Sequence, residues 1–409
     1  MVRVRPEQES SVATTQLAGT TASNMYSSPM TDPAGMLVSI ARQVVRPAAD
    51  SVDREARFPS ESFDALREAR LLSALIPTRF GGMGCSMAQI ADMCEVLGRE
   101  CGNTAMVFAM HQIQVACVVR HSNGTAFFDA YQREIADKQL LLASATSEVS
   151  IGGDVRTSLC AVECSGDEFT LRKQAPVISY GDQGDDILVT ARRHADAAPS
   201  DQVMVVARKN RTTLERTAEW HAMGFRGTCS CGNILTTAGS VEQILPHGYD
   251  EISGRTMLPV SHILWASLWL GIATDAVNRA RLFIRDAAKK KPGTMPAGAV
   301  RLAEVVALLQ VMRSTVEQAK TAFEAMYDDA DALSGMGFAL MMNNLKIQSS
   351  QLVVQVVAQA LTVCGIYGYT MDSKYSVERH LRDAYGAGIM INNDRILGAS
   401  ASMLLVHRD

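Results

Sequence analysis

In the stretch "FTLRKQAPVISYG" (residues 169–181), apolar and polar side chains largely alternate, which is a period of two residues. Three similar short runs follow it, namely "DDILVTAR" (185–192), "QVMVVAR" (202–208) and "CGNILTTAGSVEQIL" (231–245). This period, interrupted by Gly, Asp and Asn turns, is typical of β-strands. The pattern therefore predicts a β domain over residues 140–252.

On both sides of the predicted β domain, apolar residues recur every three to four positions, which predicts helices. Residues 32–139 form the expected N-terminal helical domain. Residues 253–409 form the expected C-terminal helical domain, with helices at 258–290, 298–330, 335–364 and 394–407. Residues 1–31 are rich in Ser, Thr and Ala and lack the apolar core of a secretory signal, so a flexible tail is expected there. The order of the segments indicates an α+β fold.

The composition argues against several classes of protein. The 409 residues are 47% hydrophobic and 20% charged, with a net charge of −4, so nucleic acid is not an expected partner. Nine cysteines without a regular framework predict reduced thiols in the cytoplasm, and no metal site is expected. "LPVSHILWASLWLGIA" (258–273) is too short and too interrupted for a membrane span, so a buried helix and no membrane partner are predicted.

Six short motifs occur in order along the chain. They are "LIPTRFGGMG" (75–84), "TSEVSIGGD" (146–154), "LRKQAPVISYG" (171–181), "MGFRGTCS" (223–230), "CGIYGYT" (364–370) and "YSVERHLRDA" (375–384). In these motifs and their spacing, residues 35–409 resemble the acyl-CoA dehydrogenase family of flavoproteins. The resemblance implies a helical N-terminal domain, a middle β-barrel or sandwich, and a C-terminal four-helix bundle.

The resemblance also implies a cofactor and an assembly. FAD is expected between the β domain and the C-terminal helices, in a homodimer or homotetramer whose neighbouring subunit helps bind the FAD diphosphate. The strand-linked glycine fingerprint of a Rossmann site does not occur in the sequence. The residues that the resemblance assigns to FAD are Thr146, Ser147, Ile178, Ser179, Arg285, Lys289, Gly365, Asn393 and Arg395.

The activity implied by the resemblance is α,β-dehydrogenation of an acyl thioester, bound to CoA or to a carrier protein. A base removes a proton from Cα, a hydride passes from Cβ to flavin N5, and the electrons go to an acceptor flavoprotein or to oxygen. The base needs hydrogen-bond reach to the substrate. Family members place a Glu at the position of Ile391, or in a minority branch at that of Ser261.

Since neither position holds a carboxylate, His262 is the predicted base, because imidazole titrates near neutrality. His111, Ile391 and Asn392 are expected to contact the substrate. Asp394 is expected to cap the final helix.

Two alternatives remain open. A flavin monooxygenase acting on a small molecule would need no α-proton base, which would explain Ile391 and Ser261 together. It would require a reductase partner and a rapid reaction of the reduced flavin with oxygen. A non-catalytic binding protein derived from the family would contain no flavin at all.

Overall fold

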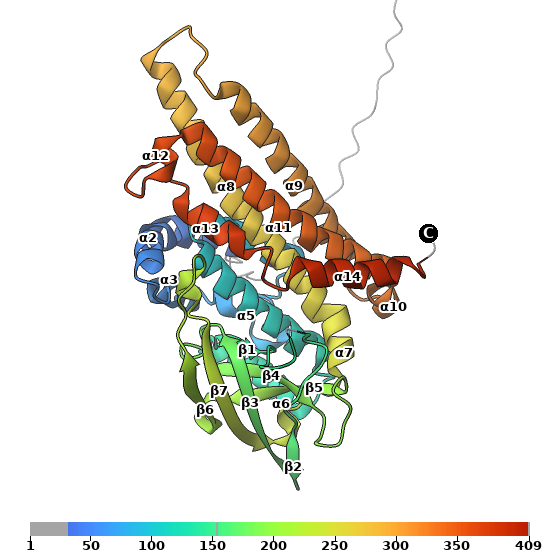
Figure 1. Ribbon diagram of the computed structural model, residues 1–409. Helices are drawn as coiled ribbons and strands as arrows, with labels where there is room; N and C mark the ends of the chain where they lie inside the picture. Colours follow the sequence, from blue (N-terminus) through green and yellow to red (C-terminus); the bar gives the residue numbers. More distant parts are fainter. Residues whose placement is uncertain (1–31, 153, 408–409) are drawn as a thin grey trace, which may run out of the picture. The chain divides into compact units, whose positions relative to one another are not determined.

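Helices form the first part of the described chain, which comprises residues 32–152 and 154–407 of a computed structural model (Figure 1). The predicted tail at residues 1–31 lies outside this range. The start of α4 is set by the local sequence, because the side chains of Ser86 and Gln89 form a reciprocal capping box there. The elements are α1 (Pro33–Ile40), the π-helical η1 (Ala41–Val45), α2 (Arg46–Arg54), α3 (Ser60–Glu68), the 3-10 turns η2 (Leu71–Ser73) and η3 (Thr78–Phe80), α4 (Met87–Glu100), α5 (Gly102–His121) and α6 (Ala126–Lys138).

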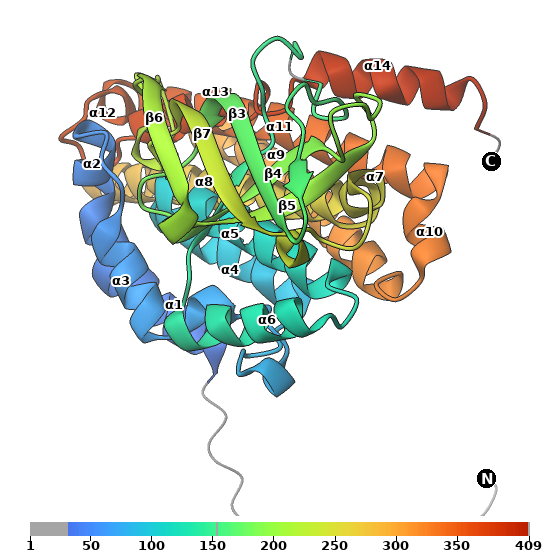
Figure 2. The ribbon, with the colours of Figure 1, turned by 90° about the horizontal axis from the view of Figure 1, so that it is seen from below.

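Within the described residues, seven strands follow in two sheets. One sheet has the order β1-β4-β5, in which β1 is parallel to β4, and the other is antiparallel with the order β2-β3-β7-β6. Figure 2 shows β3, β7 and β6 side by side. The elements are β1 (Leu142–Ala145), β2 (Glu163–Ser165), β3 (Glu168–Ile178), β4 (Asp186–Arg192), β5 (Gln202–Arg208), η4 (Lys209–Arg211), β6 (Thr212–Ala218), η5 (Arg226–Thr228), β7 (Cys231–Ser240) and η6 (Val241–Gln243).

Helices return after the sheets and include three long ones. Pro259 lies two residues after the π-helical η7, inside a helical stretch that runs from Tyr249 to Lys290. Because Pro has no backbone N–H, it donates no intrahelical hydrogen bond there. The elements are α7 (Tyr249–Ile252), the π-helical η7 (Ser253–Met257), α8 (Leu258–Lys290), α9 (Ala299–Ala325), α10 (Ala330–Ser334), α11 (Met336–Cys364), α12 (Ile366–Tyr369), α13 (Glu378–Gly386) and α14 (Asn393–Leu404).

The long helix α8 is the centre of the helical packing. It contacts α9 and α11 from its own part of the chain and α4 from the N-terminal part, while α14 lies against α11. Two glycines permit the close approach of α4 and α8. A Cβ on Gly98 would lie 2.3 Å from the Leu268 carbonyl oxygen, and one on Gly271 would lie 2.3 Å from the Glu95 carbonyl oxygen. The N-terminal and C-terminal helices therefore share one core.

The predicted helix–β–helix fold is confirmed, and the prediction of a helix at 258–290 matches α8. Within residues 32–152 and 154–407, two helical stretches, Tyr249–Lys290 and Met336–Cys364, are long and apolar enough to cross a membrane by length and composition alone. Their most apolar windows are 94% and 50% buried inside the fold. Core helices of soluble proteins pass the same test, so this finding is weak evidence for a membrane span.

Candidate functional site

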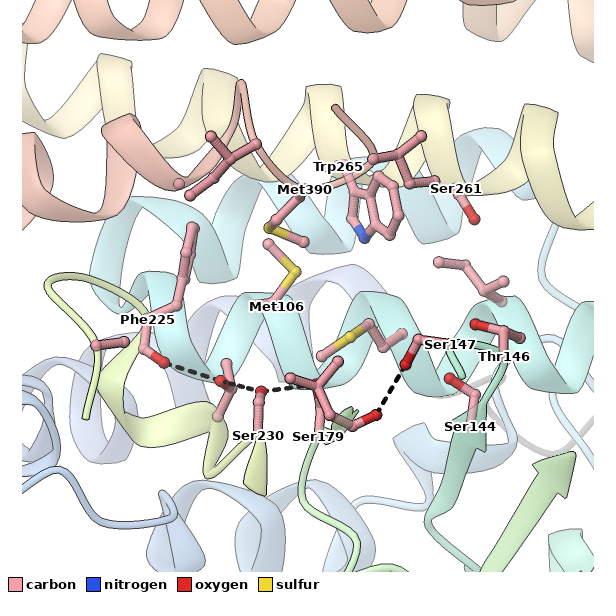
Figure 3. A pocket seen from close by; sticks show the side chains of 18 of the residues that line it. Met106, Ser144, Thr146, Ser147, Ser179, Phe225, Ser230, Ser261, Trp265 and Met390 are labelled. Carbon is pink, nitrogen blue, oxygen red and sulfur yellow. Dashed lines mark hydrogen bonds between the residues drawn. The ribbon is translucent and has the colours of Figure 1, made fainter. Parts of the chain in front are cut away.

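A cavity of about 450 Å³ lies between the strand region and the C-terminal helices (Figure 3). One side, which we call the β wall, consists of residues at the ends of β1 and β3 and in the loops from β6 to β7. The other side, the helical wall, is made by α5, η7, α8, α13 and the loop between α13 and α14. The β wall includes Ser144, Thr146, Ser147, Val177, Ser179, Trp220, Thr228 and Ser230, and the helical wall includes Met106, Met110, Ile113, Ser261, Trp265, Tyr385 and Ile391.

The hydroxyl groups of the β wall form a chain of hydrogen bonds (Figure 3). Thr228 Oγ1 donates to the Phe225 carbonyl oxygen at 2.8 Å. Because a hydroxyl carries one hydrogen, Ser230 must then donate to Thr228, over 2.8 Å, and Ser179 must donate to Ser230, over 2.7 Å. Ser147 Oγ donates to the Val177 carbonyl oxygen at 3.2 Å. Ser147 and Ser179 therefore offer only lone pairs to a ligand.

Helix α13 joins the two walls. Arg382 lines the cavity, forms ion pairs with Asp53 and Glu378, and donates to the Met223 carbonyl oxygen at 2.9 Å. Asp383 accepts the backbone N–H of Phe225 at 2.6 Å, which holds Phe225 at a left-handed φ of 48°. Burial raises the pKa of Asp383 to about 7. The Arg382-Asp383 pair thus fixes the loop that closes one end of the cavity.

The helical wall is largely apolar. Met106, Met110 and Ile113 come from α5, and Ser261 and Trp265 lie one turn apart on α8. Ser261 donates its hydrogen to the Met257 carbonyl oxygen at 2.5 Å. Among the described residues that line the cavity there is no Asp, Glu, His, Lys or Cys. The cavity therefore presents no side chain of suitable basicity to remove a proton from carbon.

Ile391, at the position of the family's usual Glu, lines the cavity with a φ of 49°. A left-handed conformation is strained for a β-branched residue, so the surroundings must impose it. Lys346 of α11 donates to the Ile391 carbonyl oxygen at 2.6 Å and to Asn393 Oδ1 at 2.7 Å. Burial lowers the pKa of Lys346 to about 8. A buried ammonium group therefore holds this part of the helical wall.

His262, the predicted base, is 2% exposed and is not among the residues that line the cavity. Its Nδ1 donates to the Met342 carbonyl oxygen at 3.1 Å, and its Nε2 is buried with no hydrogen-bond partner among the described residues. Burial lowers the pKa of His262 to about 4. Ser261 takes the cavity-facing position because successive helical residues point about 100° apart. The placement gives no route from His262 to a substrate in this cavity.

His111 also lies outside the cavity lining, so the structure does not place it in contact with a ligand of this cavity. Its Nδ1 accepts the Leu142 N–H at 3.0 Å, and its Nε2 donates to the Leu72 carbonyl oxygen at 2.7 Å. Both ring nitrogens are therefore engaged with backbone groups, which fixes one neutral tautomer. His111 ties α5 to β1 and to η2.

The start of α14 differs from the expected one. Asn392, not Asp394, caps this helix, because its side-chain oxygen accepts the Asp394 N–H at 2.8 Å. A capping side chain must stand before the first helical turn, and Asp394 already lies within it. Asn392 is exposed and does not line the cavity, so its expected substrate contact is not found either.

The structure brings together only some residues assigned to FAD by resemblance. Thr146, Ser147 and Ser179 line the cavity, whereas Ile178 is fully buried, because successive strand residues face opposite sides. These three polar residues fit the edge of a flavin ring, which carries both donors and acceptors. The site therefore fits a flavin at the β wall, with Ser147 and Ser179 as acceptors.

The other assigned residues lie elsewhere. Arg285 and Lys289 follow Ser261 by 24 and 28 residues on α8, about 36 and 42 Å along the helix axis. Gly365 ends α11, 19 residues after Lys346. Asn393 is hydrogen-bonded to Lys346 and Ser350. Arg395 lies beside Gly152, and Gly152 belongs to the loop that also brings Val155 to the cavity.

A possible metal-binding group occurs outside the cavity. His121, His247 and Glu251 each offer one ligand atom, and these atoms lie within 4.8 Å of one another. Glu251 already pairs with His247 at 3.0 Å and with Arg255 at 2.7 Å. These contacts account for the grouping, so we assign no metal to it.

Several cavity residues were not among the predicted site residues. Thr228 and Ser230 lie in "MGFRGTCS", a motif that already supported the resemblance, so their role had a local signal. Trp265 follows Ser261 by four residues, and this spacing places two side chains on one helix face. Lys346 had no such signal, because its place in an apolar helix says nothing about the loop it holds.

Comparisons with known proteins give a consistent family assignment. The family model described as acyl-CoA dehydrogenase, N-terminal domain, matches residues 34–126, and that described as acyl-CoA dehydrogenase, C-terminal domain, matches residues 253–391. A cyclohex-1-ene-1-carbonyl-CoA dehydrogenase of Syntrophus aciditrophicus (strain SB) is 23% identical over 359 residues, covering 85% of this chain and 83% of the relative. A dibenzothiophene monooxygenase of Mycolicibacterium goodii is 23% identical over 377 residues, with 85% and 88% covered.

Solved structures show the same fold. FMN-bound TdsC from Paenibacillus sp. A11-2 superimposes with a TM-score of 0.80 at 17% identity, and the match covers 92% of this chain and 98% of that one. At this identity the similarity concerns the fold alone.

Proposed function

The chain belongs to the acyl-CoA dehydrogenase family, whose members are flavin oxidoreductases, and from this premise we propose that it is a flavin-dependent monooxygenase acting on a small molecule. One observation carries the proposal. The described residues that line the cavity include no carboxylate, imidazole, amine or thiol. Dehydrogenation of an acyl thioester needs such a base within hydrogen-bond reach, whereas oxygenation does not.

The relatives are compatible with this choice, because they include both activities. They include dehydrogenases and a dibenzothiophene monooxygenase at nearly the same identity, and TdsC is itself described as a dibenzothiophene monooxygenase. Sequence similarity does not separate the two activities, so our choice between them rests on the composition of the cavity.

The proposed roles follow the two walls. A bound flavin supplies the redox chemistry, including the reaction of its reduced form with oxygen. Ser147 and Ser179 would accept hydrogen bonds from the flavin edge, and Thr146 lines the same wall. Met106, Met110 and Ile113 exclude water from the opposite side, which protects reactive species from hydrolysis.

We propose FAD as the flavin and a homodimer or homotetramer as the working form. Arg285 and Lys289 lie too far along α8 to reach a flavin in the cavity of their own chain, so they would serve the diphosphate of a neighbouring subunit. An apolar patch on and after α12 supports assembly, because four large side chains there are more than half exposed. They are Ile366, Tyr367, Tyr369 and Met371. All nine cysteines are unpaired, which supports a cytoplasmic location.

Dehydrogenation stays as the second candidate, because the first-named relative is a dehydrogenase of a CoA thioester. The electrons would then pass to an acceptor flavoprotein. This candidate requires a base from outside the described cavity lining.

The absorbance of the bound flavin distinguishes these functions. Full-length protein is loaded with FAD and mixed under nitrogen with butyryl-, isovaleryl- or octanoyl-CoA. We expect no bleaching of the oxidised flavin, and rapid reoxidation when the chemically reduced protein meets oxygen. Bleaching by any of these thioesters would establish dehydrogenation instead, and failure to bind FAD or FMN would favour a non-catalytic binding protein.

Two variants provide a positive control for this test. Ile391→Glu and Ser261→Glu each place a carboxylate in the cavity, at the two positions where the family carries one. If the cavity admits an acyl thioester, at least one variant should bleach slowly where the parent protein does not. Equal bleaching in the parent protein and in both variants would mean that the missing carboxylate does not determine the activity, and no bleaching in any of them would mean that the cavity excludes acyl thioesters.

A further inference from the structure

The indole N–H of Trp265 is a hydrogen-bond donor without an acceptor in the described part of the chain. The residue is 8% exposed and lines the cavity. Figure 3 shows the indole nitrogen at the edge of the ring that points away from α8 and into the cavity. A buried polar group left unpaired costs about 1–3 kcal/mol, so such groups in native proteins call for an explanation.

The neighbours of Trp265 do not supply that acceptor. Met106 and Met390 line the same cavity, and both are apolar. The oxygen of Ser261, one turn earlier on α8, is oriented by its own donation to Met257. The unpaired N–H is therefore left facing the space that a ligand would fill.

The charges around the cavity restrict that ligand further. Arg382 is the formally charged side chain among the described lining residues, and Asp53 and Glu378 already pair with it. An anionic ligand would find no free cation here, and a cationic ligand would find no carboxylate. The desolvation of an unpaired charge is expensive, so the cavity favours a neutral molecule.

Trp269 shows that an unpaired indole alone does not identify a ligand site. Its N–H is also buried without a partner, one helical turn after Trp265. However, Trp269 is 0% exposed and is not among the residues lining the cavity. The two tryptophans share residue type, helix and unpaired donor, and they differ in whether the side chain lines the cavity.

We propose that Trp265 is the specificity-determining donor of this cavity, and that its ligand is a neutral, mostly apolar molecule carrying one hydrogen-bond acceptor. A ring nitrogen, a carbonyl oxygen or an oxide oxygen would satisfy the indole N–H. The inference rests on the proposed function in one respect, because the ligand is then the molecule that is oxygenated. The binding itself requires no reaction.

A matched pair of probes tests the proposal. Quinoline and naphthalene have nearly the same shape, but only quinoline carries a ring-nitrogen acceptor. Their dissociation constants are measured at pH 7.5 by equilibrium dialysis against full-length protein loaded with FAD. The variants are Trp265→Phe, which removes the N–H and keeps an aromatic ring, and Trp269→Phe as the control. Thermal unfolding verifies that all three proteins are folded.

We expect the preference for quinoline over naphthalene to fall about fivefold in Trp265→Phe, the loss of one hydrogen bond of about 1 kcal/mol. The same preference should stay within about twofold in Trp269→Phe. Three outcomes would overturn the proposal: an unchanged preference in Trp265→Phe, an equal change in Trp269→Phe, or no binding of either probe.

The affinity for FAD, measured on the same proteins, separates the ligand from the cofactor. Weaker FAD binding in Trp265→Phe, with an unchanged probe preference, would show that the indole donates to the flavin and would also overturn the proposal. Because no turnover is needed, a protein that oxygenates nothing can still satisfy this test. A failure of the proposed function is thus distinguishable from a failure of this inference.

Discussion

The two walls of the cavity differ in which half of a hydrogen bond they offer. On the β wall, Ser147 and Ser179 direct their hydrogens to acceptors within the protein and present lone pairs. On the helical wall, Trp265 presents an N–H that no described residue accepts. The β wall is therefore organised by the protein's own bonds before anything binds, as suits a cofactor site. On the helical wall the Trp265 N–H lacks an acceptor among the described residues, so a ligand that supplies one is preferred.

The largest effect is expected at the seam between the walls. A Cβ on Gly224 would lie 2.3 Å from the Arg382 carbonyl oxygen and 2.7 Å from the Asp383 backbone nitrogen. Gly224→Ala should therefore separate the β-wall loop from α13 and lower the free energy of unfolding by about 3 kcal/mol or more. Urea denaturation measures this free energy of unfolding. The control is Gly254→Ala, since a Cβ there meets nothing within 4 Å. Equal stability of both variants would show that the seam is not tightly packed.

A second prediction concerns the carboxyl group that holds this seam. Unfolded Asp383 loses its proton near pH 4, whereas in the folded protein its pKa is raised to about 7 by burial. Between these values the folded state binds more protons, so the free energy of unfolding falls as the pH rises.

Asp383→Asn keeps an acceptor for the Phe225 N–H and removes this titration. Relative to the parent protein, the stability of Asp383→Asn should increase by on the order of 3 kcal/mol from pH 4.5 to pH 8, as measured by urea denaturation at each pH. A constant difference between the two proteins across this range would show that Asp383 titrates normally.

The direction of the hydroxyl chain gives a sharper test of the β wall. In Thr228→Val the hydrogen of Ser230 loses its acceptor and turns to Ser179, whose own hydrogen then points into the cavity. Ser179 would change from an acceptor into a donor. We expect the dissociation constant for FAD to rise about tenfold, compared with about fivefold in Ser179→Ala, where the group is only removed. Flavin fluorescence measures both constants. Tighter FAD binding in Thr228→Val would mean that the flavin needs a donor there.

The smallest effect is expected on the helical wall. Ile391 has a left-handed φ of 49°, a conformation that Asn adopts far more readily. Ile391→Asn should raise the free energy of unfolding by about 0.5–1 kcal/mol, offset in part by the apolar contact it loses. Ile389→Asn, at an exposed position two residues earlier, should change stability by less than about 0.5 kcal/mol. Destabilisation by Ile391→Asn would show that side-chain packing outweighs the backbone strain.

The sequence predicted the elements with a strong period and missed those without one. The strand at 202–208 and the helix at 258–290 were predicted with their observed bounds. The edge strands β2 and β6 were missed because their side chains are mostly exposed, and therefore mostly polar. β1 was missed because "LASA" is too short and small to show a pattern.

For the site, the motifs correctly predicted those cavity residues whose position depends only on where a strand ends. Thr146, Ser147 and Ser179 line the cavity as the ends of strands, and their positions follow from the motifs. His262 was chosen for its chemistry, but helical geometry turns Ser261 toward the cavity instead. Long-range contacts, such as that between Lys346 and Ile391, leave no trace in the local sequence.

The contact between Lys346 and Ile391 links occupancy of the cavity to a proton. Lys346 is buried, with a pKa lowered to about 8, and holds the backbone of a residue that a ligand touches. A ligand that shields this region further from water lowers the pKa again, so near pH 8 its binding releases protons to the solvent. Titration calorimetry in buffers with different heats of ionisation would count those protons. The number of protons released would therefore report how far the cavity is occupied by ligand.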